Sequence, residues 1–152
     1  NCPGQLVITG EADAVRRAGE TLKEKGAKRV LPLKVSGPFH SQMLLPAAEK
    51  LGKDLEKVHL REFSIPYVAN LTADYVTSPE KIREFLEKQI SSAVKWQQSV
   101  ERMIADGVTT FVEIVPGRTL TGFTKKINKE VTAINIDRYE DLAKAVEVLT
   151  NA

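Results

Sequence analysis

Segments with the residue pattern of strands alternate with segments that have the pattern of helices, and this alternation predicts an α/β fold with mostly parallel strands. The length of 152 residues suits one domain, and the composition, 42% hydrophobic and 28% charged, is close to that of soluble globular proteins. No apolar run approaches the roughly 18 residues of a membrane span. A formal net charge of +2 is too small to indicate nucleic acid or an anionic membrane as a partner.

The first 35 residues predict a β-α-β unit. Residues 6–9 are a short β-rich run, residues 11–25 carry apolar side chains at helical spacing, and residues 29–35 return to strand character. Gly26 stands where a helix commonly ends in the left-handed conformation. Pro32 favours an edge strand or a bulge over a central strand, because proline cannot donate to a ladder.

The rest of the chain predicts five helices and three strands that alternate in part. Ser78 followed by Pro79 is a strong helix start, and Gly107 marks a helix end. The expected elements are a helix over residues 41–57, a strand over 65–69, helices over 79–90 and 96–106, a buried strand over 111–115, a helix over 120–127, a strand over 131–136, and a terminal helix with Leu142, Ala145, Val146 and Leu149 facing inward.

The sequence lacks most residue patterns that perform chemistry. None of its seven serines stands in a Gly-x-Ser-x-Gly elbow, and no phosphate-binding or dinucleotide-binding loop occurs. One cysteine, Cys2, excludes an internal disulfide and a multi-thiolate zinc site and fits a reducing cytoplasm. We therefore expect no metal, no cofactor and no nucleophile in this chain. It also opens without Met and soon enters a strand pattern, as if it began inside a longer protein.

His40 is the residue best placed for a chemical role. It follows a turn after a predicted strand and precedes an amphipathic helix, so its ring would stand on a fixed frame and reach a cleft. The alternative is a partly buried histidine that caps the next helix, and position alone does not choose between the two. His59 lies among charges in a connecting stretch and indicates solvated surface. The turn over residues 116–118 could hold an anion, although such turns more often only connect elements.

Several motifs resemble those of malonyl-CoA:acyl carrier protein transacylases, with the spacing between motifs preserved. The resemblance is sharpest at Val-Ser-Gly-Pro-Phe-His-Ser, residues 35–41, and it also covers residues 1–10, 89–96 and 112–122. It spans nearly the whole chain but only the C-terminal half of the family, whose members have a two-domain length, about twice that of this chain. Val115 departs from the family, which usually has glycine there.

This resemblance implies where the chain belongs in the family's fold. Residues 1–35 would be the second half of a small ferredoxin-like subdomain, and residues 36–152 the C-terminal part of a hydrolase-like, parallel-sheet acyltransferase core. The absent N-terminal half would carry the serine in Gly-His-Ser-Leu-Gly, the oxyanion hole and the arginine that grips the malonyl carboxylate. We expect the chain alone to expose sheet edges and apolar surface, and to be poorly soluble, oligomeric or held by that half.

The resemblance also implies an activity, which is ping-pong transfer of a malonyl group from malonyl-CoA to the phosphopantetheine thiol of acyl carrier protein in cytoplasmic fatty-acid synthesis. His40 would be the catalytic histidine, and the backbone carbonyl of Gln89 would orient its ring. Because the serine half is absent, the chain alone would be inactive. The alternatives are a non-catalytic module of the same fold that binds acyl carrier protein or CoA, and, less well supported, a trans-acting acyltransferase segment of a larger synthase.

Four further residues have expected binding roles through the resemblance. Phe39 would select malonyl over methylmalonyl by its bulk, although it could merely pack the turn. Asn1 and Gln5 would line the cleft through which the pantetheine arm passes, and Asn70 would lie near the histidine. Acyl carrier proteins are acidic, so some of the basic residues could serve docking, but the sequence does not identify which.

Overall fold

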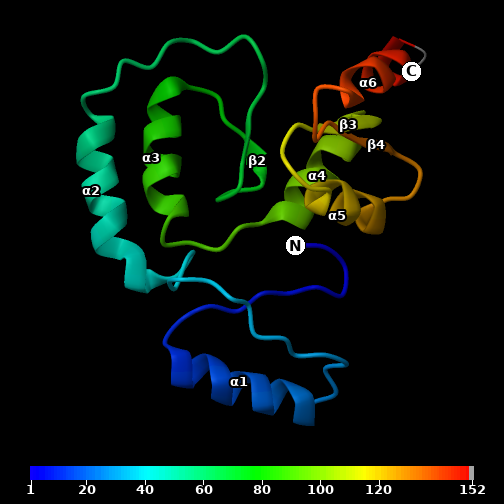
Figure 1. Ribbon diagram of the computed structural model, residues 1–152. Coiled ribbons are helices and arrows are strands. Elements are labelled where there is room, and N and C mark those ends of the chain that lie inside the picture. The colour runs from blue at the N-terminus through cyan, green and yellow to red at the C-terminus, as the bar shows by residue number, and fades with distance from the viewer. Residues whose placement is uncertain (151–152) are drawn as a thin grey trace. The chain divides into compact units, whose positions relative to one another are not determined.

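The computed structural model describes residues 1–150 and divides the chain into two compact units. One unit, here called the histidine unit, comprises Val7–Val94, and the other, called the β3–β4 unit, comprises Asn1–Leu6 and Lys95–Ala152. Figure 1 shows their elements in chain order. The expected boundary of a ferredoxin-like subdomain at residue 35 stays a prediction. Within residues 1–150 no helix has the length and apolar character needed to cross a bilayer.

The histidine unit begins with α1 (Ala12–Glu24), which matches the predicted helix closely. The Glu11 carboxylate accepts hydrogen bonds from two backbone N–H groups of the first turn. Gly26 adopts φ +94° at the other end, as predicted. There the N–H of Ala27 donates to the carbonyl of Leu22 at 2.9 Å, which closes the last turn in the arrangement typical of glycine-terminated helices.

The two strands expected to flank α1 do not form, and this part of the prediction is wrong. Neither residues 6–9 nor residues 29–35 are paired with another strand in the described chain. A strand is stable only when a neighbour satisfies its backbone N–H and C=O groups, whatever its side-chain pattern. Leu31 and Val35 are each 63% exposed, so the expected exposure of apolar surface is confirmed here.

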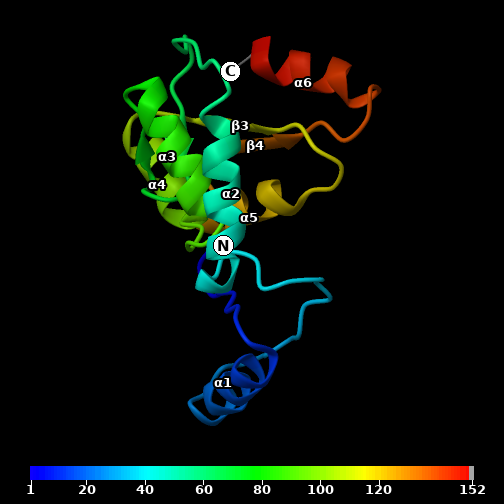
Figure 2. The same ribbon diagram turned by 90° about the vertical axis from the view of Figure 1, so that its left-hand side faces the viewer.

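Helices α2 (Leu45–Leu55) and α3 (Pro79–Gln89) lie side by side in both views (Figures 1 and 2). The predicted helix over residues 41–57 is split, with a 3₁₀ turn, η1 (Gln42–Leu44), ahead of α2. Pro46 explains the division, because it lacks the N–H that would continue α-helical bonding back to residue 42. Helix α3 begins and ends within a residue of its prediction.

A short hairpin lies between α2 and α3 in the chain. It consists of two antiparallel strands of two residues each, β1 (Val68–Ala69) and β2 (Asp74–Tyr75). The predicted strand over residues 65–69 is therefore confirmed only in its last two residues. Pro66 cannot donate a ladder hydrogen bond, and Ile65 before it is largely exposed. Strand β2 was not predicted, because a strand of two residues is too short to show an alternating pattern in the sequence.

The β3–β4 unit contains α4 (Trp96–Ala105), β3 (Thr110–Glu113), α5 (Thr119–Ile127), β4 (Thr132–Asn135) and α6 (Asp141–Thr150). Strands β3 and β4 are parallel, from Thr110 opposite Thr132 to Glu113 opposite Asn135, and α5 connects them. This β-α-β arrangement confirms the predicted parallel pairing. Helices α5 and α6 lie to either side of the strand pair in both views (Figures 1 and 2). Val100 on α4 is fully buried.

Helix α6 differs from its prediction in the face that it buries. Ala145 is buried, but the other three residues expected to face inward, Leu142, Val146 and Leu149, are 41–60% exposed. Helix α6 contacts the described chain mainly through β4, and nothing within residues 1–150 covers the rest of its apolar stripe. The apolar spacing identified the helix correctly but could not say whether a partner is present.

Candidate active site

His40, two residues before η1, is held in an unusual backbone conformation. Its φ is +60°, in the left-handed region that few residues other than glycine adopt and in which histidine is enriched. The Ser41 hydroxyl donates to the carbonyl of Pro38 at 2.7 Å and stabilises this turn from within. Backbone strain of this kind costs on the order of 1–3 kcal/mol and persists only where the surroundings enforce it.

The ring of His40 is bonded to the end of α3. Its Nδ1 lies 2.9 Å from the backbone carbonyl oxygen of Gln89, the last residue of that helix. A carbonyl oxygen can only accept, so Nδ1 carries the proton and Nε2 keeps its lone pair as a base. His40 and Gln89 are thus brought together as expected.

Phe39 precedes the histidine and lies partly in the open. Its ring is 52% exposed, and its edge approaches Gly37, where an added Cβ would be 3.7 Å from the ring. One side of the ring therefore packs on the turn while the other is accessible. Both interpretations of Phe39 have support in this geometry, and its role in selectivity stays a prediction.

The other expected site residues lie in both units. Asn70 is half-buried in the turn after β1, in the histidine unit. Asn1 is half-buried and Gln5 exposed in the β3–β4 unit, where the Gln5 side chain accepts a weak hydrogen bond from the buried thiol of Cys2. The proximity of Asn1, Gln5 and Asn70 to His40 stays a prediction. His59 is exposed, as expected.

The turn over residues 116–118 joins β3 to α5 and is occupied by the chain's own groups. The N–H of Gly117 donates to the Asp137 carboxylate at 3.0 Å, and the Asn135 amide donates to the carbonyls of Val115 and Gly117. These contacts support the interpretation of the turn as a tight connection, since a carboxylate of this chain already takes the Gly117 N–H.

Glu113, at the end of β3, has a structural role that the sequence did not reveal. Its carboxylate accepts from the N–H groups of Leu120 and Thr121 at 3.0 and 2.7 Å, in the first turn of α5. Burial acts to raise the pKa of Glu113, but the hydrogen bonds from Thr121 and Leu120 outweigh burial and lower the pKa below its usual value. One signal was available, because the residue before α5 is Arg118, which offers no capping oxygen.

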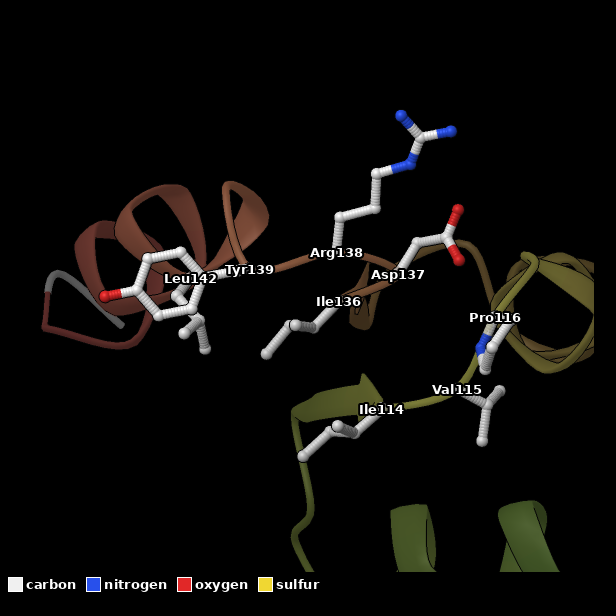
Figure 3. A pocket seen from close by; sticks show the side chains of 8 residues that line it. All are labelled: Ile114, Val115, Pro116, Ile136, Asp137, Arg138, Tyr139 and Leu142. Atoms are coloured by element: carbon white, nitrogen blue, oxygen red, sulfur yellow. The ribbon is translucent and has the colours of Figure 1, made fainter.

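A hollow lies beyond the carboxyl ends of β3 and β4 (Figure 3). It is lined mostly by apolar side chains, and Ile114 is 71% exposed. The lining residues are Ile114, Val115, Pro116, Ile136, Asp137, Arg138, Tyr139 and Leu142. The Asp137 carboxylate in this lining is engaged with the N–H of Gly117, and the hollow leaves apolar side chains exposed.

The Acyl transferase domain family matches residues 1–146 of the chain. The chain therefore belongs to this family. It is 44% identical to the malonyl CoA-acyl carrier protein transacylase of Bacillus subtilis, over 98% of this chain and 47% of that protein. The Escherichia coli K12 enzyme of the same name is 42% identical, over 97% of this chain and 48% of that protein. The chain thus spans about half the length of these relatives.

Solved structures confirm the α/β fold class. The malonyl CoA-acyl carrier protein transacylase of Clostridium perfringens has a TM-score of 0.88 and 39% identity, with 93% of this chain and 45% of that chain covered. A malonyl-transacylase in complex with a type II polyketide synthase acyl carrier protein has a TM-score of 0.87 and 40% identity, with 91% and 45% covered.

Proposed function

We propose that this chain supplies the histidine-bearing half of a malonyl-CoA:acyl carrier protein transacylase, and that a further polypeptide segment supplies the serine nucleophile. The observation that carries the proposal is the 2.9 Å contact between Nδ1 of His40 and the carbonyl of Gln89. It leaves Nε2 as an accessible base on an exposed residue. Membership of the acyl transferase domain family and the similarity to malonyl CoA-acyl carrier protein transacylases support this assignment.

The geometry fits general acid–base catalysis of two acyl transfers. Nε2 of His40 takes the proton of the serine hydroxyl as its oxygen attacks the thioester carbonyl of malonyl-CoA, and then gives that proton to the departing CoA thiolate. In the second transfer Nε2 takes the proton of the carrier protein's phosphopantetheine thiol, whose sulfur attacks the malonyl ester, and returns it to the serine oxygen. Positioned proton transfer of this kind contributes about 10²–10⁴-fold to the rate.

Phe39 is the residue that we assign to substrate selection in this proposal. Its ring stands next to the base with one side accessible, where a methyl branch on the acyl group would meet it. A single methyl group in such a place changes the transition-state free energy by about 1–3 kcal/mol. Asn1 and Gln5 are proposed to contact the pantetheine arm, and Asn70 to hold polar groups near the histidine.

The exposed apolar surface supports the proposal of a second segment. The β3–β4 pair has two strands and two open edges, whereas parallel sheets are normally covered and wider. The hollow at its carboxyl end and the unpaired residues 31–35 expose further apolar side chains. A segment that completes the sheet would bury them, and the N-terminal half of the family is the partner that we propose. The lone cysteine fits action in a reducing cytoplasm.

The test compares His40→Ala with His59→Ala, a matched control at the chain's other histidine. Each variant is combined with the serine-bearing segment, and the transfer of malonyl groups to acyl carrier protein is measured. We expect His40→Ala to lower the rate at least about 10²-fold and His59→Ala to leave it unchanged. Transfer at the normal rate by His40→Ala would contradict the assignment of His40 as the general base. Binding of carrier protein without any transfer by the unmodified pair would favour the non-catalytic module.

A further inference from the structure

A second hydrogen bond lies next to the one that orients His40. The Gln42 side chain donates from Nε2 to the backbone carbonyl oxygen of Ser91 at 3.0 Å. The donors are His40, just before η1, and Gln42, its first residue; the acceptors are Gln89, the last residue of α3, and Ser91, just after that helix. Each bond bridges 49 positions in the chain. The two donors are two residues apart, as are their two acceptors, Gln89 and Ser91.

This pair of bonds restrains the histidine more than one bond would. A ring held only at Nδ1 can pivot about that contact, which would change the direction in which Nε2 points. Gln42 lies two residues after His40, and its hydrogen bond holds this part of the backbone to Ser91, which is itself buried. The left-handed φ of His40 needs such support from both sides, and Ser41 supplies it only within the turn.

We propose that Gln42 is a positioning residue that holds His40 in its Nδ1-protonated, Nε2-basic orientation. The inference rests on the proposed function insofar as it concerns transfer, but the state of the ring is a property of this chain alone. Gln42 does not act as acid or base. Its amide keeps η1 against the end of α3, so that Nδ1 remains bonded to Gln89.

The deciding substitution is Gln42→Glu, which keeps the shape of the side chain and replaces its N–H donor with an acceptor. Gln42→Arg is the rescue variant, because the arginine Nε–H stands the same number of bonds from the backbone as the glutamine Nε2. Gln98→Glu on α4 is the matched control, an exposed glutamine that undergoes the same change of charge.

The first readout is the tautomer of His40, from the ring ¹⁵N chemical shifts of the histidine-labelled chain, measured alone and bound to the serine-bearing segment. The chain has two histidines, so His59→Ala assigns the signals. The second readout is the kcat and KM of malonyl transfer. We expect Gln42→Glu to mix the two tautomers and lower kcat about five- to tenfold, the effect of one neutral hydrogen bond, with KM unchanged.

The outcomes separate this inference from the proposed function. Restoration of the tautomer and of kcat by Gln42→Arg, with Gln98→Glu unchanged, supports the positioning role. An unaltered tautomer and kcat in Gln42→Glu would overturn it, and so would a loss that Gln42→Arg does not restore. If the unmodified pair transfers nothing, the proposed function fails, and a tautomer shift in Gln42→Glu still supports the role of Gln42 toward the ring.

Discussion

At the scale of single residues, the backbone carbonyl of Gln89, not its side chain, contacts the histidine. Replacing this side chain should therefore matter less than distorting the backbone that presents the carbonyl. We expect Gln89→Ala to keep most of the transfer activity of the reconstituted enzyme. Gln89→Pro should lower activity by about 10²-fold, because proline removes a hydrogen bond from the last turn of α3 and displaces the carbonyl. Equal losses in the two variants would assign the role to the side chain.

Glu113 gives a residue-scale prediction for stability. The pKa of Glu113 is lowered in the folded state. In the unfolded chain this carboxyl group has its ordinary pKa of about 4.3. Near and below that pH the unfolded chain therefore binds more protons than the folded chain. The stabilisation is fully present above that value and is lost as the pH falls through the folded pKa. Glu113→Gln should therefore cost about 1–3 kcal/mol at neutral pH and flatten the acid side of the stability profile.

Urea unfolding at a series of pH values measures this effect. Glu147→Gln, at an exposed position on α6, is the matched control and should leave the profile unchanged. A Glu113→Gln variant with the stability and pH profile of the unmodified chain would show that its hydrogen bonds to Leu120 and Thr121 contribute nothing measurable.

The sequence predicted these residues unevenly. The position of His40 between a turn and a helix indicated its frame, and the family resemblance supplied Gln89 as its partner. Gln42 and Glu113 were missed because each acts through a partner brought near by folding, and Gln42 reaches across 49 positions to Ser91. Such contacts leave no local pattern in the sequence.

At the scale of elements, the two glycine-terminated helices give a prediction with an internal control. Gly26 and Gly107 adopt φ of +94° and +95° at the ends of α1 and α4. Alanine at either position should lower the free energy of unfolding by about 1–2 kcal/mol, because its Cβ disfavours the left-handed conformation. Gly122 lies inside α5, where an added Cβ would meet open space and φ is not positive. Gly122→Ala should therefore raise the free energy of unfolding by about 0.5–1 kcal/mol.

Urea unfolding of the three single variants checks these opposite signs. Neutral effects of Gly26→Ala and Gly107→Ala would contradict the assigned helix ends, and destabilisation by Gly122→Ala would contradict the place of Gly122 inside α5. The helices were the best predicted elements, because capping, glycine ends and apolar spacing are local. The prediction of strands over residues 6–9 and 29–35 was wrong, since a strand depends on a partner that its own sequence does not specify.

At the scale of the whole molecule, the chain has the length of a domain but leaves some of its apolar faces uncovered. The chain carries one well-framed histidine, while no serine stands in a nucleophile elbow. The hollow beyond β3 and β4 and the outer face of α6 are exposed, as a sheet that lacks neighbours would leave them. The central claim is that base and nucleophile come from different segments and meet only when both are present.

Radiolabelled malonyl-CoA tests this claim most directly. The chain is incubated with the label alone, and then together with the segment that carries Gly-His-Ser-Leu-Gly, before acid quenching and separation of the two polypeptides. We expect no stable label on the 152-residue chain in either incubation. In the combined sample the label should lie on the serine segment and move to added acyl carrier protein. A stable malonyl ester or thioester on the 152-residue chain by itself would contradict the account.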